Sequence, residues 1–455
     1  MKGLALVLAA GKGTRMKSSG PKVMQSLLGK PMLWYVVQTL TQVLAKDVYP
    51  VVGYAKEQIL AYFKDWDLRF IEQEEQLGTG HAVQCAWPLI EEQKVDYVLV
   101  INGDTPLVQV EHVLSLIQAI RAGYDLVFLS LELADPGSYG RVVRDKDGKV
   151  LKIVEAKDCP PDLKTREINA GIYGFSIDFL SKTLFQLTNN NAQKEYYITD
   201  LVQLAIEQGY KVKAINAGTD KALLGVNTLE ELVEQEEWLR KQIIKKWLKQ
   251  GVLLRSGQHL VIGPEVELEP GAEVEGPAKI MGKSKLTKTA WIGSYVYIED
   301  SFIAGKIYEF SHIVGAKVAP GANIGPYARL RPGAIVEDMA RVGNFVEMKK
   351  TVLGPKSKAS HLTYLGDCEV EDEVNIGAGT ITCNYDGQKK HKTIIRKGAF
   401  IGSNTALVAP VEIGNNALVG AGSTITKNVE DNTVVVARAK QVVIRKKRDE
   451  LGAKK

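Results

Sequence analysis

The sequence predicts a two-part protein, in which an N-terminal α/β domain with a mostly parallel sheet precedes a parallel β-helix. Three observations lead to this fold class. Up to about residue 227, short β-rich runs alternate with helical runs. Residues 228–250 carry apolar side chains at three- and four-residue steps, and from residue 262 to about 430 aliphatic side chains return every six positions. We therefore expect a domain at 1–227, a helical linker at 228–250 and a repeat domain at 251–455 that ends in a basic tail.

The N-terminal domain shows the alternation most clearly in seven segments. The predicted strands are LALVLAA, VYPVVGY, DYVLVING, DLVFLSLEL and AGIYGFS, and the predicted helices are PMLWYVVQTLTQVL and HVLSLIQAIRAG. This order favours a sheet with helices on both faces. Because ligands bind beyond the carboxyl ends of the strands in such sheets, the loops that follow strands are where a site is expected.

The linker reads as one helix with signals at both ends. Thr228 is a capping residue with Glu231 three positions later, and Gly251 ends the pattern. An apolar stripe runs along it, interrupted by Glu236. The segment is expected to act as a rigid connector.

The C-terminal half is organised by its six-residue period. Neither a helix nor a pleated strand repeats at six, whereas a triangular β-helix does, with one inward aliphatic side chain at each step. The period continues through Ile262, Leu268, Val274, Ile280, Leu286, Ile292 and Ile298, then Val318, Ile324, Leu330, Val336, Val342 and Met348, and again Ile395, Ile401, Leu407, Ile413, Val419 and Ile425. An irregular coil is expected between the first two runs. The segment TCNYDGQKKHKT is too polar for a solenoid wall and should project as a functional loop.

Composition and charge exclude several classes of protein. The net charge of +5 is accounted for by the last eighteen residues, which carry eight Lys or Arg against two acids, so neither nucleic acid nor membrane is implied as a partner. No apolar stretch is long enough to cross a bilayer. The four cysteines, Cys85, Cys159, Cys368 and Cys383, have no metal or disulfide spacing, which fits reduced thiols in a cytoplasmic protein.

The first loop, AAGKGTRMKSSGPK, follows the first strand and suits a polyphosphate. Gly11 and Gly13 let the backbone approach a ligand, while Arg15 and Lys22 add positive charge. The loop matches neither the Walker pattern nor the dinucleotide-binding fingerprint. A tight strand-to-helix turn is an equally good account of two glycines alone, and the preceding seven apolar residues are too short to make a secretory signal attractive.

Further motifs give the loop a specific context. The pattern GxGTxM, a spacer and PK resembles the signature of sugar-1-phosphate nucleotidylyltransferases. It is accompanied, in order, by EQLGTGHA, NGDTPL, YGRVVR, IVEAKD, EINAGIY, EYYITD and GVN. Together with the six-residue repeat, the chain resembles over nearly its whole length the family of bifunctional N-acetylglucosamine-1-phosphate uridylyltransferases and glucosamine-1-phosphate N-acetyltransferases. That resemblance implies a Rossmann-like nucleotidyltransferase domain and a left-handed β-helix of hexapeptide repeats.

The resemblance assigns roles in the N-terminal domain. It implies that Lys22 and Arg15 neutralise the phosphates during catalysis and that Asp104 and Asn227 hold Mg²⁺. UTP or UDP-N-acetylglucosamine would contact Leu8, Ala9, Ala10, Gly11, Lys22, Gln73, Gly78, Thr79, Asn102, Gly103, Asp104, Gly140, Glu155, Asn169 and Asn227. Taken singly, Asp104 is also an ordinary turn residue and Asn169 an ordinary cap.

The resemblance also implies an acetyl-CoA-dependent site in the repeat domain. A base that titrates near physiological pH suits acetylation of an amine, and His361 in HLTY would be the proton acceptor, although a lone histidine is more often structural. Glucosamine phosphate would contact Arg331, Lys349, Tyr364, Asn375 and Lys390, and acetyl-CoA would contact Ala378, Asn384, Tyr385, Ser403, Ala421 and Arg438. Glu347 is a candidate to orient His361. The family forms homotrimers around the prism axis, so a homotrimer is implied.

Two other functions fit the same modules. One is a nucleotidylyltransferase with a single activity and a structural β-helix, which HLTY, NYDG and the pair Lys349 and Lys350 argue against. The other is a non-catalytic scaffold, which the intact Lys22, Asp104 and Asn227 argue against. The expected function is acetylation of glucosamine 1-phosphate followed by uridylyl transfer from UTP, with small molecules as substrates.

Overall fold

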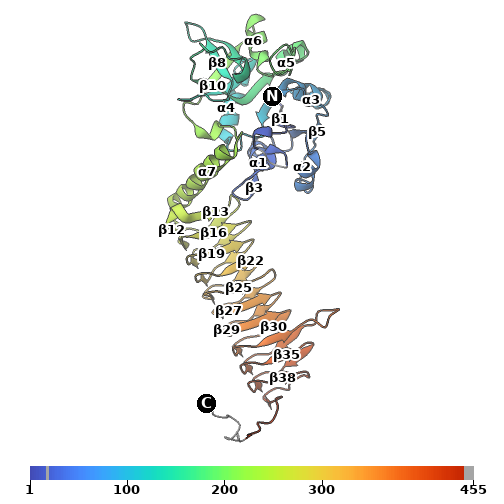
Figure 1. The fold of residues 1–455 in the computed structure, drawn as a ribbon, viewed down its shortest axis with the longest axis vertical. Coiled ribbons are helices and arrows are strands. Elements are labelled where there is room, and N and C mark those ends of the chain that lie inside the picture. Colours follow the sequence, from blue (N-terminus) through green and yellow to red (C-terminus); the bar gives the residue numbers. More distant parts are fainter. Residues whose placement is uncertain (17–19, 445–455) are drawn as a thin grey trace, which may run out of the picture. The chain divides into compact units, whose positions relative to one another are not determined.

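The computed structural model describes residues 1–16 and 20–444, and the chain divides into two compact units between Leu239 and Arg240 (Figure 1). Each unit is described separately below. The last eleven residues of the predicted basic tail lie outside the described residues. Within the described ranges, none of the helices combines the length and the apolar character that a membrane span requires.

The N-terminal unit is a central sheet in the order β11-β7-β10-β6-β1-β4-β5, with β8 and β9 paired beside β10. Its strands are β1 (Gly3–Ala9), β4 (Val48–Val52), β5 (Ile71–Glu72), β6 (Tyr97–Asn102), β7 (Leu126–Glu132), β8 (Arg141–Arg144), β9 (Val150–Val154), β10 (Glu167–Ser176) and β11 (Val212–Asn216). A small hairpin is formed by β2 (Ser26–Leu27) and β3 (Lys30–Pro31). The helices are α1 (Met32–Leu44), α2 (Lys56–Tyr62), α3 (Thr79–Gln93), α4 (Val110–Arg121), α5 (Ile177–Thr183) and α6 (Asp200–Glu207).

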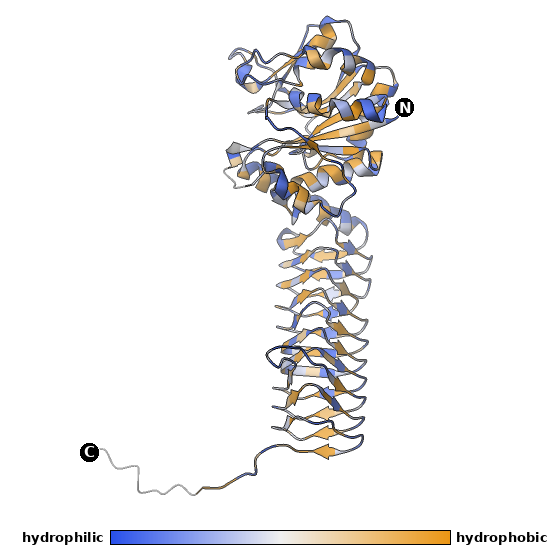
Figure 2. Ribbon diagram, turned by 90° about the vertical axis from the view of Figure 1, so that its right-hand side faces the viewer, coloured by the Kyte–Doolittle hydropathy of each residue, from blue (hydrophilic) through white to orange (hydrophobic). Residues whose placement is uncertain are grey.

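Helices cover both faces of this sheet, as the sequence predicts. The side chains of β1 alternate between the faces: Ala5 and Val7 pack with α1 and α4, whereas Leu4 and Leu6 pack with α3, α5 and α6. Figure 2 shows the resulting apolar strands at the centre of the unit. The five predicted strands and two predicted helices are all present, with ends that differ by a few residues.

The sheet is less parallel than the sequence suggests. Strand β10 runs antiparallel to both β6 and β7, and β8 and β9 form an antiparallel hairpin between β7 and β10. A parallel pair needs a long crossover, usually a helix, and no such helix separates β7 from β10 in this described segment. Strands β1, β4, β5 and β6 keep the parallel arrangement that carries the first loop.

The predicted linker helix is α7 (Leu229–Lys249). Its first turn is closed as expected, because the Thr228 hydroxyl accepts from the Glu231 amide while the Glu231 carboxylate accepts from the amides of Asn227 and Thr228. Leu232 and Leu239 pack on the N-terminal unit, and Ile244 and Trp247 are part of the core of the second unit.

The second unit is a parallel β-helix with three faces, and each strand pairs with strands one coil away. The first face contains β12 (Leu253–Arg255), β15 (Glu273–Glu275), β18 (Trp291–Ile292), β21 (Lys306–Ile307), β24 (Asn323–Ile324), β27 (Arg341–Lys349), β29 (Lys358–Gly366), β31 (Asn375–Ile376), β34 (Phe400–Ile401), β37 (Leu418–Val419) and β39 (Val434–Val435). The second contains β13 (Leu260–Ile262), β16 (Ala278–Met281), β19 (Val296–Glu299), β22 (His312–Val314), β25 (Arg329–Leu330), β32 (Ile381–Cys383), β35 (Ala406–Val408) and β38 (Thr424–Ile425), and also the second halves of β27 and β29. The third contains β14 (Glu267–Leu268), β17 (Lys285–Leu286), β20 (Phe302–Ile303), β23 (Lys317–Val318), β26 (Ile335–Val336), β28 (Val352–Leu353), β30 (Cys368–Val370), β33 (Thr393–Ile395) and β36 (Val411–Ile413).

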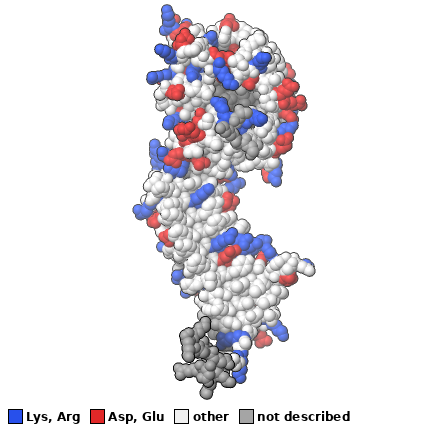
Figure 3. Space-filling view, viewed as in Figure 1, with Lys and Arg blue, Asp and Glu red and all other residues white. Residues whose placement is uncertain are grey.

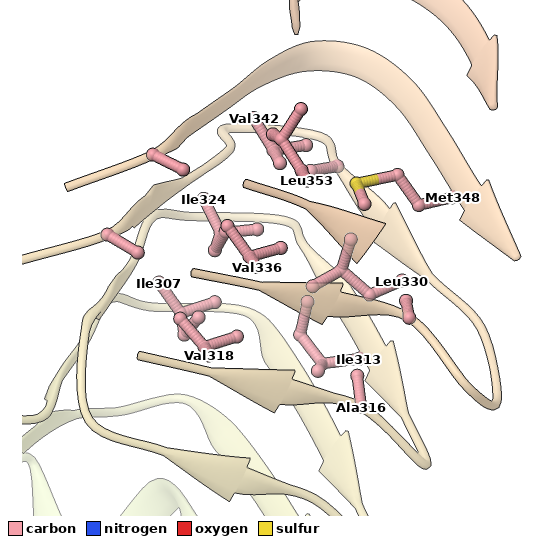
Figure 4. Packing of buried hydrophobic residues seen from close by; sticks show 14 of the residues in the cluster. Ile307, Ile313, Ala316, Val318, Ile324, Leu330, Val336, Val342, Met348 and Leu353 are labelled. Carbon is pink, nitrogen blue, oxygen red and sulfur yellow. The ribbon is translucent and has the colours of Figure 1, made fainter. Parts of the chain in front are cut away.

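The six-residue aliphatic positions form the core of the prism. Ile324, Val336 and Val342 point into it from successive faces, and the same positions stack from coil to coil (Figure 4). The expected irregular coil is a shortened one, because Trp291 pairs with Lys306, 15 residues later, where Glu273 pairs with Trp291 at 18. The second break is a 25-residue step between Asn375 and Phe400.

The longer step contains the predicted projecting loop, which extends outward between β32 and β33 (Figure 1). The loop is held by its own contacts: Tyr385 pairs with Lys390, and the Asp386 carboxylate accepts from two loop amides and contacts His391 Nε2 at 2.7 Å. These bonds hold the pKa of Asp386 well below its ordinary value, with the amide of Lys389 contributing most. All four cysteines are free, as expected.

Candidate active sites

The first candidate site lies at the carboxyl ends of β1 and β6. These strands are parallel neighbours, with Leu8 opposite Asn102, so the loops that follow them lie side by side. The Gly103 amide donates to the Leu8 carbonyl at 2.9 Å. A side chain at Gly103 would come within 2.9 Å of that oxygen, so the backbones of the two loops can approach only without one.

Four polar side chains meet at this point. Lys22 Nζ lies 2.5 Å from Asp104 Oδ2 and 2.9 Å from Asn227 Oδ1, and the Arg15 guanidinium donates to the same Asn227 oxygen at 2.8 Å. Lys22 is only 9% exposed, so its charge faces these oxygens in a partly dry environment. The two sequence-predicted catalytic cations and the two predicted metal ligands therefore converge.

Asn227 reaches this centre from a distant part of the chain because its backbone is fixed on both sides. The Val226 amide donates to the Asp104 carbonyl at 2.8 Å, and the Asn227 amide is capped by Glu231 at the start of α7. The Tyr139 hydroxyl donates to the Gly225 carbonyl at 2.8 Å. Burial raises the pKa of Tyr139, so this hydroxyl stays protonated and keeps donating.

The two glycines of the first loop serve different purposes. Gly13 has a φ of +61°, and a side chain there would lie 2.4 Å from Lys22 Cβ, so glycine is needed for the loop to pack against the lysine. A side chain at Gly11 would meet nothing within 4 Å. The space above Gly11 is therefore open to a ligand.

Within the described residues, three cavities share the Asp104 carboxylate, with volumes of 640, 260 and 200 Å³. The largest is bordered by Leu8, Ala9, Gly11, Arg15, Lys22, Glu155 and Asn227, among others. The second is bordered by Leu8, Ala10, Gly11, Gln73, Gly78, Thr79 and Asn102. The third is bordered by Thr79, Asn102, Gly140, Glu155, Asn169 and Asn227. The structure thus gathers every N-terminal residue that the sequence singles out, with Gly103 supporting the loop behind them.

The third cavity is lined by polar groups that are already oriented. The Asn169 amide nitrogen donates to the Tyr173 hydroxyl at 2.5 Å, and its oxygen accepts from the Gly171 amide at 3.1 Å. The Thr199 hydroxyl donates to the Glu155 carboxylate at 2.9 Å. Burial raises the pKa of Glu155 above its ordinary value. Such a cavity can recognise the hydroxyl and amide groups of a sugar.

The second candidate site follows one edge of the prism, where the chain turns from the first face to the second. His361 lies at this edge, and its Nδ1 is 2.7 Å from Asn344 Oδ1 on the preceding coil. Ala378, Ser403 and Ala421 continue down the same edge, as the amides of Asn404 and Gly422 donate to the carbonyls of Ala378 and Ser403. Arg438 closes this column by donating to the Ala421 carbonyl at 2.6 Å.

A basic cluster lies on the second face beside His361. Lys390 and Arg331 lower the pKa of Lys349, which shows that the three predicted phosphate contacts lie close together. The Arg331 guanidinium donates to the Glu347 carboxylate at 2.8 Å. Figure 3 shows basic side chains gathered beside the projecting loop. The prediction that Glu347 orients His361 is wrong for the chain described: Glu347 pairs with Arg331, and Asn344 contacts the histidine.

The remaining predicted contacts divide between two faces. Tyr364 and Asn384 lie on the second face, where a side chain at Gly366 would meet the Tyr364 hydroxyl at 2.4 Å and Asn384 Nδ2 at 2.8 Å. Tyr385 is 60% exposed on the projecting loop. Asn375 lies on the first face, opposite Lys358 and Phe400. The contacts within the described chain do not bring Asn375 to the basic cluster.

Comparisons with known proteins agree with both sites. The family of MobA-like NTP transferase domains matches residues 5–146, and the bacterial transferase hexapeptide family, with six repeats, matches residues 392–427. A protein of Oleidesulfovibrio alaskensis called bifunctional protein GlmU is 51% identical over 98% of each chain. Proteins with the same name from Nitratidesulfovibrio vulgaris and Clostridium novyi are 48% and 43% identical over 97% or more of each chain.

The chain belongs to the bifunctional GlmU family. As a GlmU it combines a nucleotidyltransferase unit with a hexapeptide-repeat unit, which confirms the predicted fold class and bifunctional enzyme. Sequence reasoning missed some residues that border this GlmU's cavities, namely Gln76, Ser138, Lys157, Gln193, Glu195 and Thr199. Several of them sit next to predicted motifs, and EYYITD contains two. Asn344 was also missed, and its signal is the 17-residue step to His361.

Proposed function

We propose that this enzyme makes UDP-N-acetylglucosamine in two steps. The repeat unit transfers the acetyl group of acetyl-CoA to the amine of glucosamine 1-phosphate. The N-terminal unit then joins N-acetylglucosamine 1-phosphate to the uridylyl group of UTP and releases pyrophosphate. The observation that carries the proposal is the meeting of Lys22, Arg15, Asp104 and Asn227 at the end of β1 and β6, in a chain that belongs to the GlmU family.

Uridylyl transfer brings several anionic oxygens together, so the chain must supply cations and alignment. Lys22 and Arg15 neutralise the phosphates of UTP as the sugar phosphate oxygen attacks the α-phosphorus. The open backbone at Gly11 lets the triphosphate lie close to the loop. Uridine occupies the cavity lined by Ala10, Gln73 and Gly78, and the amino sugar occupies the cavity lined by Gly140, Glu155 and Asn169.

Asp104 and Asn227 fit a magnesium ion. Their oxygens both contact Lys22 Nζ, at 2.5 and 2.9 Å, so they already converge on one cationic position. Among the described residues there is no group of three or more His, Cys, Asp or Glu side chains, which suits an ion that takes most of its ligands from water and phosphates. When bound, Mg²⁺ bridges phosphate oxygens and offsets the charge that develops on them.

In acetyl transfer, the amine nitrogen of glucosamine 1-phosphate attacks the thioester carbon. A carbon–nitrogen bond forms, the carbon–sulfur bond breaks, and the proton lost by the amine passes through His361 to the departing thiolate. Arg331, Lys349 and Lys390 hold the sugar phosphate by charge. Acetyl-CoA lies along the edge formed by Ala378, Ser403 and Ala421, with Asn384, Tyr385 and Arg438 as polar neighbours.

The proposal includes a homotrimer in the cytoplasm. A ladder of stacked aromatic rings follows the prism edge above His361, and its rings are 60, 47, 49 and 58% exposed in Tyr295, Phe310, Tyr327 and Phe345. Such a continuous apolar stripe is suited to a protein interface. Asn375 also lies on the face next to the basic cluster, so a neighbouring copy could complete the acetyl-transfer site with it.

Two substitutions test the proposal. Asp104→Ala should abolish pyrophosphate release from UTP and leave thiol release from acetyl-CoA unchanged, whereas His361→Ala should do the reverse. The matched controls are Asp65→Ala and His259→Ala, which change exposed side chains in the same two units. Loss of both activities, or of neither, in either variant would contradict the assignment of the two sites.

A further inference from the structure

We propose that Asn344 is a positioning residue that fixes the tautomer of His361 and so leaves Nε2 free to accept a proton. The inference rests on the proposed acetyl transfer at His361. It concerns a residue that touches neither substrate in the arrangement described above, and acts through the histidine.

The contact is built into the register of the prism. Asn344 and His361 are directly paired in the parallel strands β27 and β29, one coil apart, and Asn344 Oδ1 lies 2.7 Å from His361 Nδ1. The histidine backbone is fixed as well, because the buried Thr363 hydroxyl donates to the His361 carbonyl at 2.7 Å. The imidazole is thus held from its ring and from its main chain.

The chemistry of an amide oxygen decides which nitrogen carries the proton. An amide oxygen only accepts, so a bond between Asn344 Oδ1 and Nδ1 requires the proton on Nδ1. A neutral imidazole then has its lone pair on Nε2. If the amide were turned, its NH₂ group would donate to Nδ1, and Nε2 would carry the proton and be unable to act as the base.

The neutral amide also differs from the carboxylate that often orients a histidine. A carboxylate would favour the charged imidazolium before the reaction begins, whereas the amide orients the ring without adding a negative charge. The nearest carboxylate on the same strand, Glu347, is paired with Arg331 at 2.8 Å. The arrangement suits a base that must start the reaction without a proton.

In the reaction, Nε2 takes the proton from the attacking amine as the carbon–nitrogen bond forms. The same proton then goes to the sulfur of coenzyme A as the carbon–sulfur bond breaks, so the histidine returns to its starting state. Nδ1 keeps its proton throughout, because its bond to Asn344 Oδ1 persists.

The first test compares two substitutions of Asn344 in the full-length enzyme. Asn344→Leu removes the acceptor and should lower kcat for acetyl transfer by about 10- to 100-fold, with KM for both substrates changed by less than about 2-fold. Asn344→Asp keeps an acceptor of the same shape and should stay within about 5-fold of the parent kcat. An unchanged kcat in Asn344→Leu, or equal losses in the two variants, would overturn the proposal.

The second test reads the tautomer directly and needs no activity. Ring-¹⁵N-labelled histidine in the parent enzyme gives signals from six residues, and the difference from His361→Gln assigns those of His361. Without substrates at neutral pH, Nδ1 should carry the proton and Nε2 should not. In Asn344→Leu the two tautomers should mix. A proton on Nε2 in the parent enzyme would overturn the proposal.

The controls separate this inference from the proposed function and from misfolding. Asn323→Leu removes another amide from the same prism face and should leave both readouts as in the parent enzyme. Uridylyl transfer reports that each variant is folded. If the parent enzyme shows the predicted tautomer but His361→Ala retains acetyl transfer, the proposed function fails while the positioning inference stands.

Discussion

The two sites differ in the shape of the surface that carries them. The first is a hollow, in which loops after β1 and β6 and the start of α7 enclose a nearly buried lysine. The second is a convex edge, with its basic cluster, its histidine and its coenzyme column spread over successive coils. A hollow excludes water by itself and strengthens charge interactions. A convex edge needs a second surface to do the same.

Lys22 offers the largest expected effect. Lys22→Met should lower uridylyl transfer by about 10³-fold, because it removes a buried cation from the phosphate position. It also frees Asp104 and Asn227, so Mg²⁺ should bind more tightly than in the parent enzyme when no nucleotide is present. Pyrophosphate release and calorimetric titration with Mg²⁺ measure the two effects. Lys46→Met, on the surface of the same unit, is the control.

The comparison predicts that the convex site depends on assembly. Tyr327→Lys combined with Phe345→Lys should break the aromatic ladder, abolish self-association and lower acetyl transfer by about 100-fold, with uridylyl transfer within about 2-fold. Lysine fits these positions, since Lys350 and Lys356 adopt the same left-handed backbone at other corners. Sedimentation and the two product assays measure the outcome.

Phe302→Lys provides the matched control, because Phe302 is an exposed aromatic residue on the third face. It should leave both assembly and acetyl transfer as they are. A double variant that is monomeric yet fully active in acetyl transfer would show that the edge is complete in one chain.

Salt should act more strongly on the exposed site. Arg331, Lys349 and Lys390 face solvent, so ionic screening weakens their hold on a phosphate. Raising the ionic strength from about 0.05 to 0.5 M should increase KM for glucosamine 1-phosphate by about 5-fold, and KM for UTP by less than about 2-fold. Equal increases would mean that both phosphates are equally exposed.

The smallest expected effect concerns Asp200, in the first turn of α6. Burial raises its pKa to about 6, with Asp158 adding repulsion. Its contribution to stability is therefore full below the unfolded pKa of about 4 and is lost as the pH rises through about 6. Asp200→Asn should raise Tm at pH 8 by roughly 2–4 °C, about 1 kcal/mol, and change it little at pH 4. Thermal unfolding at both pH values checks this.

Local sequence patterns carry most of the fold because each element depends on neighbours in the chain. The six-residue aliphatic repeat defines the prism, and Thr228 with Glu231 marks the start of α7. The antiparallel course of β10 could not be read from its composition, since it depends on the absence of a crossover helix. The site residues of the first loop were found because the motif places them together.

The contacts between coils were harder to predict. Glu347 and Asn344 are both polar, three residues apart, on one strand, and the sequence favours the carboxylate as the partner of His361. The partner is decided instead by register: Asn344 lies opposite His361, whereas Glu347 lies opposite Tyr364 and beside Arg329. A coil of 17 residues rather than 18 is enough to change which residues meet.

The hairpin inserted after Cys383 shows how a uniform scaffold can gain a specialised feature. The extra residues leave the prism and return without altering the pairing of the flanking strands, since Thr382 still stacks on Leu407 and Ile395 on Ile413. The added segment is stabilised by its own bonds, so its length and chemistry can change while the wall stays constant. Grafting a different hairpin at this point is therefore a route to new substrate preference that costs the architecture little.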